Sequence, residues 1–228
     1  TGSTCRSLHL PNRWVFGFLS CLPFRVPEIV HLKTLKPKER EALAGRAAAL
    51  IEQGALVLFP TETVYGLAAN AAQADALGKL AAFAPGVKRT ISAKGVGPTG
   101  FTWHAPSAEV VAKALRLKAP VHQRILAKLL PGPVRLLVDG AFAKPIAGEI
   151  SGAFLVADVA SVRIPDHAFA REVLTRVRVP VAMDRVPSAM STTGKLLDGA
   201  DLALSLEAAG VALCIDDGPT KFGMISSA

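Results

Sequence analysis

Residues Phe59-Pro60-Thr61-Glu62-Thr63-Val64-Tyr65-Gly66-Leu67 join a predicted strand to a polar turn. The continuous apolar run from Ala55 to Phe59 predicts a strand that is buried on both faces of a sheet. In open α/β sheets, ligands bind beyond the carboxyl ends of the strands. The polar side chains after this strand therefore form either a candidate site or an ordinary polar turn. They are Thr61, Glu62, Thr63 and Tyr65.

The rest of the chain alternates β-rich segments with Ala-rich helical segments, which is typical of an α/β protein. Its 228 residues, 50% of them hydrophobic, suffice for one large domain with one core. We expect strands at residues 29–32, 55–59, 101–104, 134–138, 154–157, 161–164, 180–183 and 211–216. We expect helices at residues 38–53, 73–83, 107–115, 121–130, 166–176 and 201–209, with Asp166 as the N-cap of the helix at 166–176.

The net charge is +8, from 26 Lys and Arg against 18 Asp and Glu. This balance favours a polyanionic partner such as RNA or a nucleotide, although a merely basic surface is the alternative. Cys5, Cys21 and Cys214 are too few and too widely spaced for a disulfide framework, so we expect a reducing, cytoplasmic location. Neither cysteines nor histidines show metal-site spacing, and no apolar run reaches the roughly 18 residues that a membrane span needs.

Residues 1–27 are basic and contain no acidic residue. A targeting segment, a remnant and a true extension are all open interpretations. We expect a poorly ordered extension at 1–27, followed by one domain at 28–228.

A second candidate segment is the loop at residues 84–100, which contains Lys88, Arg89 and Lys94 beside hydroxyl groups and glycines. Cations and close backbone approach suit a triphosphate, although a solvated basic loop is the alternative. The pattern is not a P-loop, because GxxxxGK[ST] is absent.

Three later segments carry further candidates. Arg163 lies inside the short apolar strand at 161–164, where a charge is costly unless it is paired or faces a ligand. The alternative is an edge strand with Arg163 in water. A hydroxyl-rich turn at 187–194 contains Ser188, and the turn at 216–223 adds Lys221.

Together these segments resemble the YrdC-like family. FPTETVYGLAANA at 59–71 is similar to the family's N-terminal signature, and Leu130-Pro131-Gly132-Pro133-Val134 to its PGP turn. Lys94 stands where the family has Lys-x-Arg. The segments at 162–167, 187–189 and 217–223 resemble VRxPxH, PSAN and DGGPTRYG, respectively. The resemblance implies a twisted mixed sheet with flanking helices, in a domain that is truncated at its C-terminus.

The resemblance also implies an activity. Such enzymes join L-threonine, bicarbonate or CO2, and ATP into threonylcarbamoyl-AMP with release of pyrophosphate, and Mg²⁺ is expected with ATP. Partner transferase proteins then move the group to tRNA. The implied threonine contacts are Thr61 and Thr63, and the implied catalytic residues are Lys94 and Arg163. The implied ATP contacts are Arg89, Lys94, Arg135, Ser161, Arg163, Ser188 and Lys221.

Three positions depart from the family pattern: Val96 replaces the Arg of Lys-x-Arg, Met190 replaces the Asn of Ser-x-Asn, and Arg135 stands where Thr is usual. Arg89 and Arg135 are candidates to replace the missing cation. The alternative function is therefore a catalytically impaired relative that binds tRNA, double-stranded RNA or nucleotide. A hydrogenase-maturation domain is disfavoured, because no Cys-rich zinc segment is present.

Overall fold

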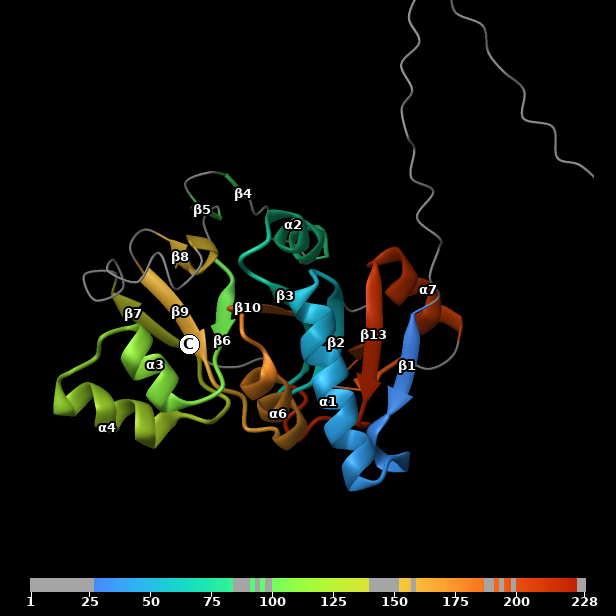
Figure 1. Cartoon of the computed structure of the whole chain (residues 1–228), viewed down its shortest axis with the longest axis horizontal. Helices are drawn as coiled ribbons and strands as arrows, with labels where there is room; N and C mark the ends of the chain where they lie inside the picture. Colours follow the sequence, from blue (N-terminus) through green and yellow to red (C-terminus); the bar gives the residue numbers. More distant parts are fainter. Residues whose placement is uncertain are drawn as a thin grey trace, which may run out of the picture.

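One twisted sheet with helices on both sides forms the body of the protein (Figure 1). The computed structural model describes residues 27–83, 91–92, 95–96, 100–139, 152–156, 159–186, 191–192, 195–197 and 200–224. Within these ranges, no helix is both long and apolar enough to span a lipid bilayer. The predicted fold class, α/β with a twisted mixed sheet and flanking helices, is confirmed.

The first third of the chain follows the order β-α-β-β-α, which is the predicted β-α-β-α order with one additional strand. The strands are β1 (Glu28–His31), β2 (Leu56–Pro60), β3 (Tyr65–Asn70), β4 (Ile91–Ser92), β5 (Gly95–Val96), β6 (Thr102–His104), β7 (Leu136–Asp139), β8 (Leu155–Val156), β9 (Val159–Arg163), β10 (Val181–Arg185), β11 (Ser191–Thr192), β12 (Lys195–Leu196) and β13 (Val211–Asp216). The helices are α1 (Pro37–Glu52), α2 (Ala74–Ala82), α3 (Ala108–Ala114), α4 (Pro120–Leu129), α6 (Ala168–Arg176) and α7 (Ala200–Ala208), with short 3₁₀ turns η1 (Leu32–Thr34) and η3 (Gly152–Phe154).

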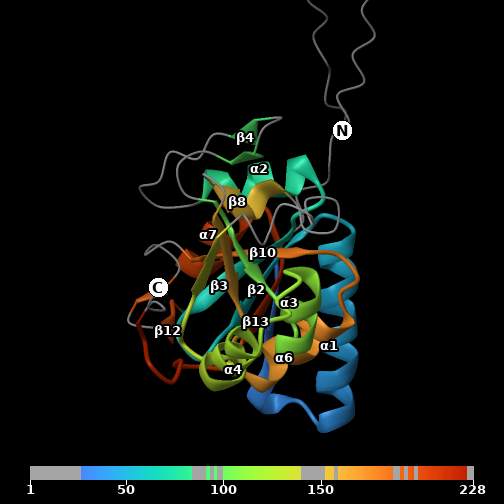
Figure 2. The same cartoon turned by 90° about the vertical axis from the view of Figure 1, so that its left-hand side faces the viewer.

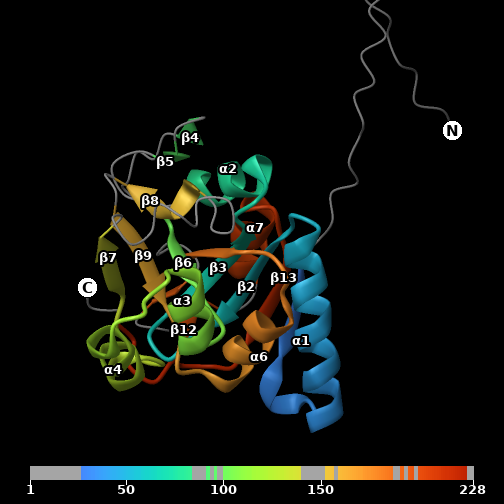
Figure 3. The same ribbon diagram turned by 60° about the vertical axis from the view of Figure 1, so that its left-hand side comes forward.

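The main sheet has the strand order β1-β13-β2-β3-β10-β6-β9-β7, and β8 pairs with β9. β1, β13 and β2 are parallel, and so are β6 and β9, whereas β3, β10 and β7 are antiparallel to their neighbours. Figure 3 shows β7, β9 and β6 at one end of the sheet and β13 beside α1 at the other. The sheet is therefore mixed, and segments from both halves of the chain meet in its centre.

β2 is buried on both faces, as its continuous apolar sequence predicts. Val57 and Phe59 pack against α1 and α6, while Leu56 and Leu58 point into the cluster that includes α2 and α7. Figure 2 shows α1 and α6 on one side of the sheet and α7 on the other. Two apolar layers thus clamp the strand that leads directly into the signature turn.

The prediction missed β3, which we had treated as part of a polar turn. Its residues, Tyr65–Asn70, include Gly and two alanines, which have little intrinsic preference for strands. Burial between β2 and β10 overrides that preference, and all six residues are buried. A Cβ atom at Gly66 would lie 2.6 Å from Cε of Met183, so a larger residue there would require that flexible side chain to move.

The predicted N-cap of the helix at 166–176 was also wrong. His167 is the N-cap, and its ring Nδ1 accepts a hydrogen bond of 3.3 Å from the backbone N–H of Ala170. Asp166 instead donates its own backbone N–H to Glu62. The helix therefore starts two residues later, at Ala168, because Asp166 is used by the turn after β2.

The phenol of Tyr65 ties three strands together. Tyr65 is fully buried, and its hydroxyl lies 2.7 Å from both Oδ1 of Asp216 and the carbonyl oxygen of Gly218. The N–H of Asp217 donates to the phenol oxygen, and His31 from β1 contacts the other oxygen of Asp216. Burial would raise the pKa of Asp216, but hydrogen bonds from Tyr65, Gly218 and His31 outweigh it and hold that pKa below its ordinary value.

We predict that Tyr65→Phe lowers the free energy of unfolding by about 1–3 kcal/mol, because it leaves buried partners of the phenol unsatisfied. Urea denaturation monitored by circular dichroism measures this change. Thr175→Val is the matched control, since it removes an exposed hydroxyl that bonds only within α6, and should change stability by less than about 0.5 kcal/mol. Equal effects of the two substitutions would contradict the proposed importance of the network.

Candidate functional site

A cavity of about 280 Å³ opens beside four strands of the main sheet. β2 ends one residue before Thr61, and β6, β9 and β10 end at His104, Arg163 and Arg185. β6 runs antiparallel to β10, so the cavity is lined by residues along both of these strands and not by their carboxyl ends alone. The full lining is Thr61, Val64, Tyr65, Gly66, Thr102, His104, Arg135, Arg163, Met183, Asp184 and Arg185.

The turn between β2 and β3 is closed by Thr61. Its hydroxyl donates to the carbonyl oxygen of Val64 at 2.7 Å and receives longer hydrogen bonds from the N–H groups of Thr63 and Val64. Thr61 is only 3% exposed, yet it lines the cavity. Because its hydrogen is donated to Val64 and its oxygen already receives hydrogen bonds from the turn, the Thr61 hydroxyl closes the turn and presents mainly its methyl group and backbone to the cavity.

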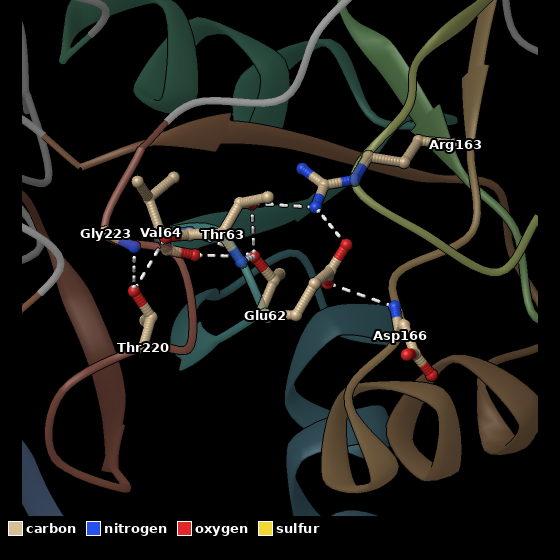
Figure 4. Close-up of polar contacts among 8 residues, drawn as sticks. Glu62, Thr63, Val64, Arg163, Asp166, Thr220 and Gly223 are labelled. Atoms are coloured by element: carbon tan, nitrogen blue, oxygen red, sulfur yellow. Dashed lines mark hydrogen bonds and ion pairs between the residues drawn. The ribbon is translucent and has the colours of Figure 1, made fainter.

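Arg163 is anchored to this turn by an ion pair (Figure 4). Its Nη2 atom lies 2.7 Å from Oε1 of Glu62 and 2.7 Å from the hydroxyl oxygen of Thr63. The side chains of Arg163 and Glu62 are 6% and 2% exposed, so both charges are withdrawn from water. Our alternative of an edge strand with Arg163 in water is wrong, since β9 lies between β6 and β7.

The hydroxyls of the turn continue this contact as a directed chain. Thr61 and Thr63 are 2.9 Å apart, and the hydrogen of Thr61 is used by Val64. Thr63 must therefore donate to Thr61, and the chain runs from Arg163 through both threonines to a backbone carbonyl. Hydrogen bonds in such a chain polarise and strengthen one another.

Glu62 fixes a second segment as well. Its Oε2 atom accepts the backbone N–H of Asp166 at 3.0 Å, while Oε1 holds Arg163. One buried carboxylate thus connects the turn after β2 to both the end of β9 and the approach to α6. The three segments cannot shift independently without leaving a buried charge unpaired.

The segment after β13 supports the turn from its other side (Figure 4). The hydroxyl of Thr220 donates to the carbonyl oxygen of Thr63 at 2.6 Å, and the N–H of Phe222 donates to the carbonyl oxygen of Glu62 at 2.9 Å. Lys221 is exposed, with its ammonium 5.1 Å from the ring centre of Phe222. It lines a separate hollow with Glu62 rather than the main cavity.

His104 is a cavity residue that the sequence did not suggest. It is 7% exposed, and its Nδ1 lies 3.1 Å from the carbonyl oxygen of Thr102. Burial, reinforced by the charge of Arg163, lowers the pKa of His104 to about 3. A neutral imidazole whose Nδ1–H faces a carbonyl keeps Nε2 as an acceptor. Arg185 was also missed, because only the strand register places it here.

The predicted site residues lie in several different places. Thr61, Arg135 and Arg163 line the cavity. Thr63 does not line it but accepts a hydrogen bond from Arg163. The hydroxyl oxygen of Ser161 lies 3.0 Å from that of Thr102. Lys221 lies elsewhere, as described above. Arg89, Lys94, Ser188 and Met190 fall outside the described residues, and Val96 is described only as part of β5.

Among the described residues, no group of three or more His, Cys, Asp or Glu side chains is arranged to hold a metal ion. Asp184 is the carboxylate that lines the cavity itself. The cavity therefore combines three guanidinium groups with one carboxylate and a few neutral acceptors, which is suited to binding an anion with a polar body.

The chain matches known proteins over most of its length. Residues 49–227 match the Sua5/YciO/YrdC family model, whose description is "Telomere recombination". The threonylcarbamoyl-AMP synthase of Pyrococcus abyssi is 33% identical over 184 residues, which cover 79% of this chain and 48% of the relative. The synthase of Bos taurus is 29% identical, covering 80% of this chain and 59% of the relative. The chain thus spans about half the length of the curated relatives it matches.

Solved structures give the same picture. The structure of Pyrococcus abyssi Sua5 complexed with L-threonine is 26% identical, with a TM-score of 0.56, and the match covers 86% of this chain and 51% of that one. Escherichia coli YciO, at 14% identity, supports the fold alone, with a TM-score of 0.59 and coverage of 84% and 83%.

The lowered pKa of His104 predicts how stability depends on pH. Between pH 6.5 and about 3 the unfolded chain binds a proton on this ring and the native state does not. The contribution of His104 is therefore complete above pH 6.5 and falls as the pH drops, by up to about 1.4 kcal/mol per pH unit. His104→Asn should flatten the pH dependence of the free energy of unfolding between pH 4.5 and 6.5, as measured in urea at several pH values.

His122→Asn, on α4 and outside the cavity, is the matched control for this titration. If the free energy of unfolding changes with pH equally steeply in wild type and in His104→Asn over that range, the imidazole is protonated in the folded protein.

Proposed function

Since this chain belongs to the Sua5/YciO/YrdC family, we propose that it is an L-threonylcarbamoyladenylate synthase. It would join L-threonine, bicarbonate or CO2, and ATP into threonylcarbamoyl-AMP and release pyrophosphate, for threonylcarbamoyladenosine modification of tRNA. The contact between Glu62 and Arg163 carries the proposal. It joins the signature turn to the Val162–His167 segment, 101 residues along the chain, at one cavity.

The reaction suits the cavity's chemistry. The neutral amine nitrogen of L-threonine bonds to the carbon of CO2 and releases one proton to solvent. An oxygen of the resulting carbamate then attacks the α-phosphorus of ATP as the bond to pyrophosphate breaks. Negative charge develops on phosphate oxygens in the second step. Preorganised guanidinium groups in a partly dry site stabilise such charge without reorganisation, and Arg163 is held in place by Glu62 and Thr63. We assign the positioning of the amino acid to Thr61, at the closed turn.

Further roles remain proposals that rest on the family. Lys94 would act with Arg163 on the phosphates, and Thr63, Arg89, Ser161, Ser188 and Lys221 would contact threonine or ATP directly or through their neighbours. Mg²⁺ would enter with the triphosphate, because this ion is usually held by substrate phosphates and few carboxylates, and Asp184 lines the cavity. We also propose a cytoplasmic location, a single domain at 28–228, and transfer of the product by a partner protein that modifies tRNA.

A second candidate function is binding of tRNA or nucleotide without turnover. Val96 and Met190 replace polar residues of the family motifs, and the net charge of +8 favours a polyanion. The two functions differ in whether L-threonine is consumed.

We predict pyrophosphate release from ATP and bicarbonate that depends on L-threonine. Arg163→Lys should lower kcat/KM by about a hundredfold or more, because a lysine ammonium is one compact charge and lacks the planar fork that can hold Glu62 and Thr63 on one nitrogen and a ligand on another. A coupled pyrophosphate assay measures both the dependence of release on L-threonine and kcat/KM. Arg171→Lys is the matched control, since Arg171 is exposed on α6 away from the cavity.

Release that is the same with and without L-threonine would contradict the synthase. In that case, the affinity for tRNA would be measured at several salt concentrations to test the second function. This function requires that the affinity for tRNA fall steeply as the salt concentration rises.

A further inference from the structure

Arg135, which precedes β7, and Arg163, at the end of β9, both line the cavity. β7 pairs with β9 in antiparallel register, with Leu136 opposite Val162. Arg135 and Arg163 are the next residues beyond this pair. On the other side of β9, His104 is the register partner of Arg163. The three side chains form one row along the wall of the cavity.

This row is unfavourable without a ligand. Like charges directly opposite each other on adjacent strands are destabilising. Glu62 compensates Arg163, and His104 is neutral, but no described residue forms an ion pair with Arg135. The exposed cation Arg185 adds further positive charge to the lining, opposed there by Asp184 alone.

Two buried donors in this row also have no partner. The Nε atoms of Arg135 and Arg163 are both buried, and neither has a hydrogen-bond acceptor among the described residues. Glu62 and Thr63 both bond Nη2 of Arg163, so its Nε cannot turn toward a protein acceptor without breaking the ion pair. A buried N–H without an acceptor is costly, and an acceptor supplied by a bound ligand would remove that cost.

We propose that Arg135 and Arg163 together form an oxyanion subsite, in which one carboxylate or phosphate group accepts both Nε–H donors. The proposal rests on the proposed function for the identity of the ligand, since both L-threonine and ATP carry such a group. It gives Arg135, which the family resemblance implied only as an ATP contact, a shared ligand group with Arg163, and it makes Glu62 a positioning residue that aims Arg163.

The test measures binding of two probes, inorganic pyrophosphate and L-threonine, by isothermal titration calorimetry at fixed ionic strength. Arg135→Gln should weaken binding of at least one probe by at least about tenfold, the value of one lost charge-assisted hydrogen bond. Arg135→Lys keeps the charge and should weaken it less. Arg171→Gln removes the same net charge from an exposed site and should leave both affinities within about twofold.

The stability of the protein without ligand gives a second readout. Because Arg135→Gln relieves the repulsion of Arg163, it should leave the melting temperature unchanged or raise it, while reducing the rise caused by the probe. A purely structural arginine would show the opposite sign, a lower melting temperature with an unchanged response to the probe.

Each outcome decides the matter. Loss of pyrophosphate binding assigns the subsite to phosphate, and loss of threonine binding assigns it to carboxylate. Unchanged affinity for both probes in Arg135→Gln, or no binding of either probe by the wild-type protein, overturns the proposal. If the wild-type protein binds a probe through Arg135 yet releases no pyrophosphate from ATP, the subsite stands and the synthase function fails.

Discussion

The buried ion pair between Glu62 and Arg163 is the contact on which the site depends. Two opposite charges, 2.7 Å apart and almost fully withdrawn from water, are tolerable only if the backbone holds them together. The clamped strand β2 delivers Glu62, and β9, inside the sheet, delivers Arg163. Removing either partner leaves a buried charge uncompensated, so the fold and the cavity are coupled through this one pair.

The polar neighbours of this pair either orient Arg163 or support the turn that contains Glu62. Thr63 and Glu62 occupy one nitrogen of Arg163 and so orient the guanidinium, while Thr220 and Phe222 support the backbone of the same turn from behind. The segment after β13 therefore acts through the turn and not through direct contact with the main cavity. Segments that are far apart in the sequence therefore support the same turn.

The sequence allowed the fold class, most elements and the family resemblance to be predicted, and all three are confirmed. Long apolar runs such as Ala55 to Phe59 carry their own signal, whereas β3 does not, because tertiary burial decides its structure. The need for a partner of Arg163 was predictable, but its identity was not, since Glu62 lies 101 residues away. His104 and Arg185 could not be predicted, because only the strand register brings them to the cavity.

A double-mutant cycle on the buried pair tests the account most directly. Glu62→Gln, Arg163→Gln and the double variant would be compared with wild type by urea denaturation. We predict a coupling energy of at least about 1.5 kcal/mol, because each single substitution strands the other charge and the double substitution strands none. Effects that add to within about 0.5 kcal/mol would show that the two side chains act independently, and would contradict the account.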